Sequence, residues 1–197
     1  MVFQILKSNI KSFDVISEDL GDVTEDVIVL RDKHHFPGMR VLQFELDKIF
    51  SENIFSENSV VCTGTHDNDT LLGWFESLPE HSINEEILAK DMLLDFFQCT
   101  KDDIHWKIIN YAQGRKGNTV IIPLQDILGE NSSGRFNTPG TLSTDNWSWR
   151  VREDALIQPL KTKLTGLTID HKRMLEKKLI NMELYFLHIE VIKEKYF

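Results

Sequence analysis

Four short apolar segments, separated by longer segments with helical periodicity, constrain the fold of this chain more than any other feature. They span residues 13–16, 39–44, 59–62 and 119–124. Their lengths and β-branched residues predict buried strands, and the intervening helices predict a parallel sheet with right-handed crossovers. Four such strands make either a small open sheet or half of an eight-stranded barrel, which needs about 250 residues in all. The pattern alone leaves both architectures open.

Capping and periodicity signals place helices between these strands. Thr24 is expected to cap a helix whose inward stripe includes Val27 and Leu30. Asp69 or Thr70 is expected to cap the next helix, and residues 84–97 form a strongly amphipathic segment.

Composition and charge exclude several classes of function. The chain has 197 residues with a formal net charge of −9, which argues against binding nucleic acid or an anionic membrane surface. No apolar run approaches the roughly 18–20 residues of a membrane span. The first residues lack a signal-peptide pattern, and Cys62 and Cys99 show no metal-binding spacing. We therefore expect a cytoplasmic protein.

Acidic clusters follow two of the predicted strands. Glu18 and Asp19 come after residues 13–16, and His66 and Asp67 follow the strand at residues 59–62. Active sites of parallel α/β folds lie at the carboxyl ends of the strands. Two strands that each end in acid suggest carboxylate chemistry on a polyol or sugar.

Each cluster also has a purely structural interpretation. Glu18 is either an exposed loop acid or a general acid/base, whose pKa would have to be raised by burial or by Asp19. His66 and Asp67 either act on a ligand or belong to a polar loop that leads into the next helix. A metal site is a weaker hypothesis, because no His-x-His or His-x3-His spacing supports it.

Two further segments after the last strand carry polar and aromatic side chains. Arg135 and Asn137 supply hydrogen-bond donors on a turn made rigid by Pro139. Trp147 and Trp149 alternate along an extended segment, so they either stack on sugar rings or pack into the core. The pattern favours the core.

Six blocks of sequence, taken in order, resemble one known family. They read ISEDLG, FPGMRVLQF, TGTHDNDTLLGW, IIPLQDILG, RFNTPGT and NWSWR. Over residues 10–152 the chain resembles the C-terminal half of the 4-α-glucanotransferases, also called amylomaltases or disproportionating enzymes. The resemblance implies an α/β fold in which residues 1–152 form strands five to eight of a TIM (β/α)8 barrel of the α-amylase-like type. Residues 153–197 then form a helical tail.

The resemblance also implies a reaction and its residues. The family transfers a segment of an α-1,4-glucan to a sugar 4-hydroxyl by a retaining mechanism with two carboxyl groups. Glu18 corresponds to the general acid/base and Asp67 to the transition-state stabiliser. The implied sugar contacts are His66, Asp19, Arg135 and Asn137. The resemblance implies no cofactor and no metal, with maltooligosaccharides and α-1,4-glucans as ligands.

The nucleophile of the family has no counterpart in this sequence. It is an Asp within an Arg-x-Asp-His-Phe-type motif, which the chain lacks. Asp14 lies only four residues before Glu18 on the same predicted strand, so it cannot replace that Asp. We therefore expect a truncated chain that is inactive alone and needs the N-terminal half of the barrel as a partner. The alternative is a non-catalytic fragment that binds glucan or another protein. An independent flavodoxin-like domain fits poorly, because residues 17–21 would repel phosphate.

Overall fold

The computed structural model describes residues 2–10, 15–46, 55–82 and 87–174. The chain divides into two compact units between Ala155 and Leu156. The second unit contributes one described helix, α8 (Gln158–Asp170). Residues 175–197, the end of the predicted helical tail, lie outside the described residues.

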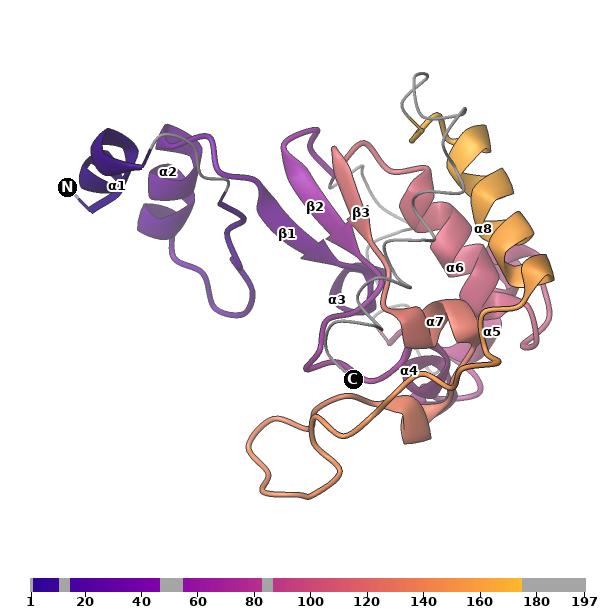
Figure 1. Ribbon diagram of the computed structural model, residues 1–197. Helices are drawn as coiled ribbons and strands as arrows, with labels where there is room; N and C mark the ends of the chain where they lie inside the picture. Colours follow the sequence, from indigo (N-terminus) through magenta and orange to yellow (C-terminus); the bar gives the residue numbers. More distant parts are fainter. Residues whose placement is uncertain (1, 11–14, 47–54, 83–86, 175–197) are drawn as a thin grey trace. The chain divides into compact units, whose positions relative to one another are not determined.

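The first unit is built on a parallel three-stranded sheet (Figure 1). Its strands are β1 (Gly38–Val41), β2 (Ser59–Cys62) and β3 (Thr119–Ile121), in the order β1-β2-β3. Both pairings are parallel, as the alternation of strands and helices predicts. Ser17 makes a further parallel bridge to Gly38 on the other side of β1. The chain that carries Glu18 therefore lies beside β1.

Two predicted strands are shorter than expected. The segment 39–44 leaves the sheet at Val41 and turns directly into α3 (Leu42–Glu45). The segment 119–124 leaves it at Ile121, because Pro123 has no N–H for a ladder bond and instead precedes α7 (Leu124–Leu128).

The first predicted strand is only partly described. Residues 13 and 14 lie outside the described part, and Ile16 is 49% exposed rather than buried. Within the chain as described, the apolar side chain of Ile16 has no second layer packed over it.

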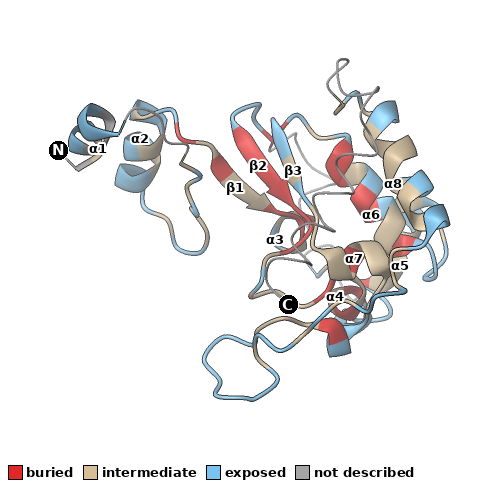
Figure 2. Cartoon of the chain, viewed as in Figure 1, coloured by how far each residue is buried: buried red, intermediate tan, exposed pale blue. Residues whose placement is uncertain are grey.

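The core lies around β2 and the helices that follow it. All four residues of β2 are buried, and Val60 and Cys62 pack with Val41 of β1 (Figure 2). Further buried side chains come from α4 (Leu71–Ser77), α5 (Lys90–Phe97) and α6 (Ile104–Gln113). The central strand is thus buried along its whole length, and the loop that carries His66 and Asp67 begins where this strand ends.

The remaining helices show where helical patterns mislead. Helix α1 spans Val2–Asn9 and α2 spans Glu25–Lys33. Thr24 occupies the N-cap position of α2 without a side-chain cap bond, and the expected inward residues Val27 and Leu30 are 47% and 46% exposed. The prediction of an inward stripe on α2 is wrong for the described chain, in which no residue of this helix is buried.

Candidate active site

The loop after β2 is fixed by its own side chains. The Asn68 carboxamide oxygen accepts hydrogen bonds from both the backbone N–H (2.9 Å) and the hydroxyl (2.8 Å) of Thr65. The backbone N–H of Asp67 donates to the same hydroxyl at 3.3 Å. This compact turn places His66 and Asp67 just beyond the carboxyl end of the central strand.

The end of the loop serves the structure of helix α4. The Thr70 hydroxyl accepts a bond from the backbone N–H of Gly73 at 3.1 Å, which confirms Thr70 as the cap. Asp69 accepts bonds from the backbone N–H of Thr70 (2.7 Å) and from the hydroxyl of Ser132 (2.7 Å). Asp69 therefore connects the loop to η2 (Ser132–Gly134).

Asp67 meets the two donors predicted from the later segment. The Asn137 amide donates to Asp67 Oδ1 at 2.7 Å, and the Arg135 guanidinium donates to the Asp67 backbone carbonyl at 2.8 Å. His66 Nε2 lies 3.3 Å from Asp67 Oδ1, and both side chains are nearly half exposed. Residues 70 positions apart in the sequence thus form one polar cluster.

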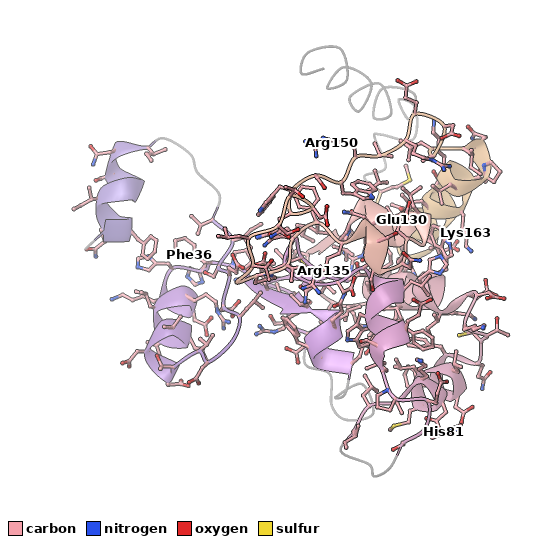
Figure 3. All side chains as sticks on the ribbon, turned by 90° about the horizontal axis from the view of Figure 1, so that it is seen from below. Phe36, His81, Glu130, Arg135, Arg150 and Lys163 are labelled. Carbon is pink, nitrogen blue, oxygen red and sulfur yellow. The ribbon has the colours of Figure 1, made fainter. Side chains whose placement is uncertain are left out.

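A cleft of about 980 Å³ brings together the two predicted carboxylates. Glu18, next to the isolated bridge at Ser17, and Asp67, in the loop after β2, both line it. Asp19 and Arg135 belong to the same lining, and Arg135 is labelled in Figure 3.

Glu18 and Asp19 differ sharply in their surroundings. The Glu18 side chain is exposed. The Asp19 carboxylate is only 4% exposed, pairs with Arg31 and Arg40, and accepts a 2.7 Å bond from the backbone N–H of Met39. Asp19 is therefore engaged by protein groups, whereas Glu18 is accessible from the cleft.

An aromatic group borders His66. The ring centroids of His66 and Trp147 lie 5.2 Å apart, and Phe136 meets Trp147 edge-on at 5.0 Å. Trp147 is 53% exposed and has a φ of 64°, a strained region for a bulky residue. The prediction that Trp147 packs into the core is therefore wrong. Trp149 is half-buried and lines a smaller cavity of about 270 Å³ together with His66 and Arg135.

Sequence reasoning missed one buried carboxyl group beside the site. Asp126 of α7 is 1% exposed and accepts bonds from the Thr63 hydroxyl (2.5 Å) and the Leu71 backbone N–H (2.7 Å). Burial raises its pKa to about 6, against the opposing effect of these two bonds. It ties the end of β2 and the start of α4 to α7. Its only signal in the sequence is an acid inside an otherwise apolar block.

The described residues show neither a metal cluster nor a membrane span. Among them, no group of three or more His, Cys, Asp or Glu side chains is arranged to hold a metal ion. No helix in the described ranges is long and apolar enough to cross a membrane.

The described chain combines a parallel sheet with a carboxylate-lined cleft. A parallel α/β sheet presents an exposed Glu and a hydrogen-bonded Asp in one cleft, with an imidazole, an amide and a guanidinium beside the Asp. These groups make the cleft a polar, carboxylate-bearing site.

Comparison with known proteins identifies the family. The sequence model described as 4-alpha-glucanotransferase matches residues 1–156, so the chain belongs to that family. It is 39% identical over 160 residues to a 4-alpha-glucanotransferase from Synechocystis, covering 78% of this chain and 30% of that protein. It is 36% identical over 167 residues to the chloroplastic/amyloplastic 4-alpha-glucanotransferase of Arabidopsis thaliana, covering 82% and 28%.

A solved structure agrees with the sequence matches. An amylomaltase from Streptococcus agalactiae in complex with acarbose superposes with a TM-score of 0.75 at 26% identity, over 87% of this chain and 34% of that one. The chain thus has the fold of part of an amylomaltase. It spans about 30% of the length of the curated relatives it matches.

Proposed function

We propose that this chain forms part of the catalytic cleft of a 4-alpha-glucanotransferase, which transfers a segment of an α-1,4-glucan to the 4-hydroxyl of an acceptor sugar. One observation carries the proposal: Glu18, next to the bridge between Ser17 and β1, and Asp67, in the loop after β2, line the same cleft. Membership of the family supports the choice of reaction.

Under this proposal the two carboxyl groups have separate roles. Glu18 protonates the glycosidic oxygen as the bond breaks and then takes a proton from the acceptor hydroxyl. Its exposure leaves it accessible to a sugar oxygen. Asp67 keeps its negative charge and stabilises the positive charge that develops on the sugar ring.

The neighbouring polar groups complete the proposed sugar site. His66 donates a hydrogen bond to a hydroxyl of the sugar held at the point of cleavage. Asp19, Arg135 and Asn137 lie beside these carboxyl groups, where their side chains bond to protein groups and support the site.

We further propose that the nucleophile comes from polypeptide outside these 197 residues. A retaining reaction needs a second carboxylate that attacks the anomeric carbon, and the sequence contains no Arg-x-Asp-His-Phe motif. In this arrangement the described strands, with the segment at Ser17, are strands five to eight of a (β/α)8 barrel. Strands one to four then belong to the missing part. The chain alone is then inactive, and at most it binds glucan.

Reconstitution tests the proposal. The chain is co-expressed with the part of the Synechocystis relative that it does not match, and conversion of maltotriose to glucose and longer dextrins is measured. We expect activity only with both parts present. Robust conversion by the chain alone would overturn the assignment of the nucleophile.

Matched variants locate the chemistry within the reconstituted pair. Glu18→Gln and Asp67→Asn should each reduce transfer at least about 100-fold. Glu57→Gln and Asp95→Asn make the same chemical changes at exposed positions outside the cleft lining and should leave transfer unchanged. Normal transfer by Glu18→Gln would refute its proposed role.

A further inference from the structure

We propose that Asn137 and Arg135 are positioning residues that fix the Asp67 carboxylate, and that neither one binds the sugar through its hydrogen-bonding side chain. The role of Asp67 itself rests on the function proposed above. The positioning rests on hydrogen-bond geometry within this chain.

The two residues hold Asp67 at two points. Asn137 Nδ2 donates to Asp67 Oδ1 at 2.7 Å, and Arg135 Nη2 donates to the Asp67 backbone carbonyl at 2.8 Å. Arg135 Nε also donates to the Asn137 backbone carbonyl at 2.9 Å. The planar guanidinium thus bridges two main-chain carbonyls and sets the distance between the two segments. Asn137 therefore fixes the side chain of Asp67, and Arg135 fixes its backbone.

The kinds of donor preserve the charge that the reaction needs. Asn137 is neutral, so it orients the carboxylate without cancelling its negative charge. The positive charge of Arg135 is directed at carbonyl groups, and in the described part of the chain Arg135 forms no ion pair with the Asp67 carboxylate. A stabiliser of a cationic transition state must retain its own charge and be oriented in advance.

The two carboxylate oxygens of Asp67 differ in their contacts with the protein. Asn137 and His66 both approach Oδ1. Among the described residues, no hydrogen bond or ion pair reaches Oδ2. Asp67 lines the cleft, so Oδ2 is the oxygen left for the substrate.

The positioning segment is itself braced. The backbone N–H of Trp147 donates to the Phe136 carbonyl at 2.7 Å, and the Asn146 side chain accepts a bond from the Thr138 N–H at 3.0 Å. These bonds flank Asn137 on both sides. The segment is therefore held by the chain around residues 146–147 as well as by Arg135.

A double-mutant cycle on the chain tests the coupling without requiring activity. Urea unfolding is followed for Asn137→Ala, Asp67→Ala and the double variant. We expect Asp67→Ala to shift the urea midpoint much less in the Asn137→Ala background than in the wild-type chain. Asn118→Ala, at an exposed position, should add fully to Asp67→Ala. Additive shifts for Asn137 and Asp67 would overturn the proposal.

Kinetics of the reconstituted pair distinguish positioning from sugar binding. Asn137→Ala should lower kcat about 10–100-fold while KM for maltotriose changes less than about twofold. Arg135→Lys keeps the charge but loses the fork, and should show the same pattern. A raised KM with unchanged kcat would overturn the proposal. If the wild-type pair is inactive, the proposed function fails, and the unfolding cycle still decides the positioning.

Discussion

The buried carboxyl group of Asp126 predicts an unusual dependence of stability on pH. Its side chain is 1% exposed. Burial raises its pKa from 3.8 to about 6, hydrogen bonds from Thr63 and Leu71 oppose the rise, and the charge of Asp69 adds to it. The test is the replacement Asp126→Asn, which removes the titration and keeps the shape of the side chain.

The size and sign of the effect follow from the difference in pKa. In the unfolded chain this carboxyl group loses its proton near its ordinary value of 3.8, whereas in the folded chain it holds the proton up to about pH 6. The folded state therefore binds more protons between these values, and its stability falls as pH rises through that window. The full loss is about 3 kcal/mol, of which about 2 kcal/mol falls between about pH 4.5 and pH 7.5.

The assay compares urea unfolding of wild type and Asp126→Asn across this range. The Asn oxygen can still accept from the Leu71 N–H, and its amide can donate to the Thr63 hydroxyl if that group rotates. The free energy of unfolding of the variant, minus that of the wild type, should increase by about 2 kcal/mol from about pH 4.5 to about pH 7.5. Asp95→Asn, at an exposed position, provides the control and should give a flat difference.

A flat difference for Asp126→Asn would refute this reasoning. So would a difference that decreases with pH, because it would mean that the folded chain favours the ionised carboxylate. The hydrogen bonds from Thr63 and Leu71 would then outweigh the cost of burial.

Two further predictions concern buried polar groups. Asp19→Ala should lower the free energy of unfolding, measured in urea, by about 2–4 kcal/mol. The reason is that it leaves the mostly buried Arg31 and Arg40 without their shared carboxylate. A change below about 0.5 kcal/mol would show that water solvates both guanidinium groups. Iodoacetamide at about pH 8 should modify Cys99 well before Cys62, because burial raises the pKa of the Cys62 thiol to about 11 and leaves it 2% exposed. Mass spectrometry follows the alkylation of both thiols. Equal rates of alkylation in the native chain would contradict this explanation, whereas equal rates in urea are expected.

The sheet was predictable because the sequence carries its signals locally. Residues 60–62 of β2 are all apolar, which is typical of a strand buried on both faces, and Thr70 begins the next helix with a side-chain cap. Strand ends were less predictable. The segment 39–44 continues apolar after Val41 because Leu42 enters the core from a helix instead of a strand. A short apolar run cannot distinguish these two conformations.

The burial of individual side chains was the property least well predicted from the sequence. Val27, Leu30 and Ile16 look like core residues, yet each is nearly half exposed in the described chain. An apolar stripe shows only that a side chain can be buried, and the covering surface must come from elsewhere in sequence or from another polypeptide. The positive φ of Trp147 and its ring contacts with Phe136 and His66 are likewise features that no local pattern encodes.

The sequence nominates candidate site residues, whereas the contacts between them come only from the structure. The blocks around Glu18, Asp67 and Arg135 identify the residues, and the structure places them along one cleft. The bonds from Asn137 to Asp67 and from Asp126 to the end of β2 join positions at least 55 residues apart. Such pairings depend on the packing of the whole unit, so spacing in the sequence cannot reveal them.

Under the proposed function, Glu18 supplies protons and Asp67 supplies charge within one glucan cleft. The most direct test compares maltotriose with a maltosyl fluoride donor in the reconstituted pair, because fluoride leaves without a proton while a sugar leaving group needs one. Glu18→Gln should lose transfer from maltotriose and still consume the fluoride donor in forming the glycosyl intermediate. Asp67→Asn should lose both reactions. Equal losses on both donors for Glu18→Gln, or normal use of the fluoride by Asp67→Asn, would contradict the account.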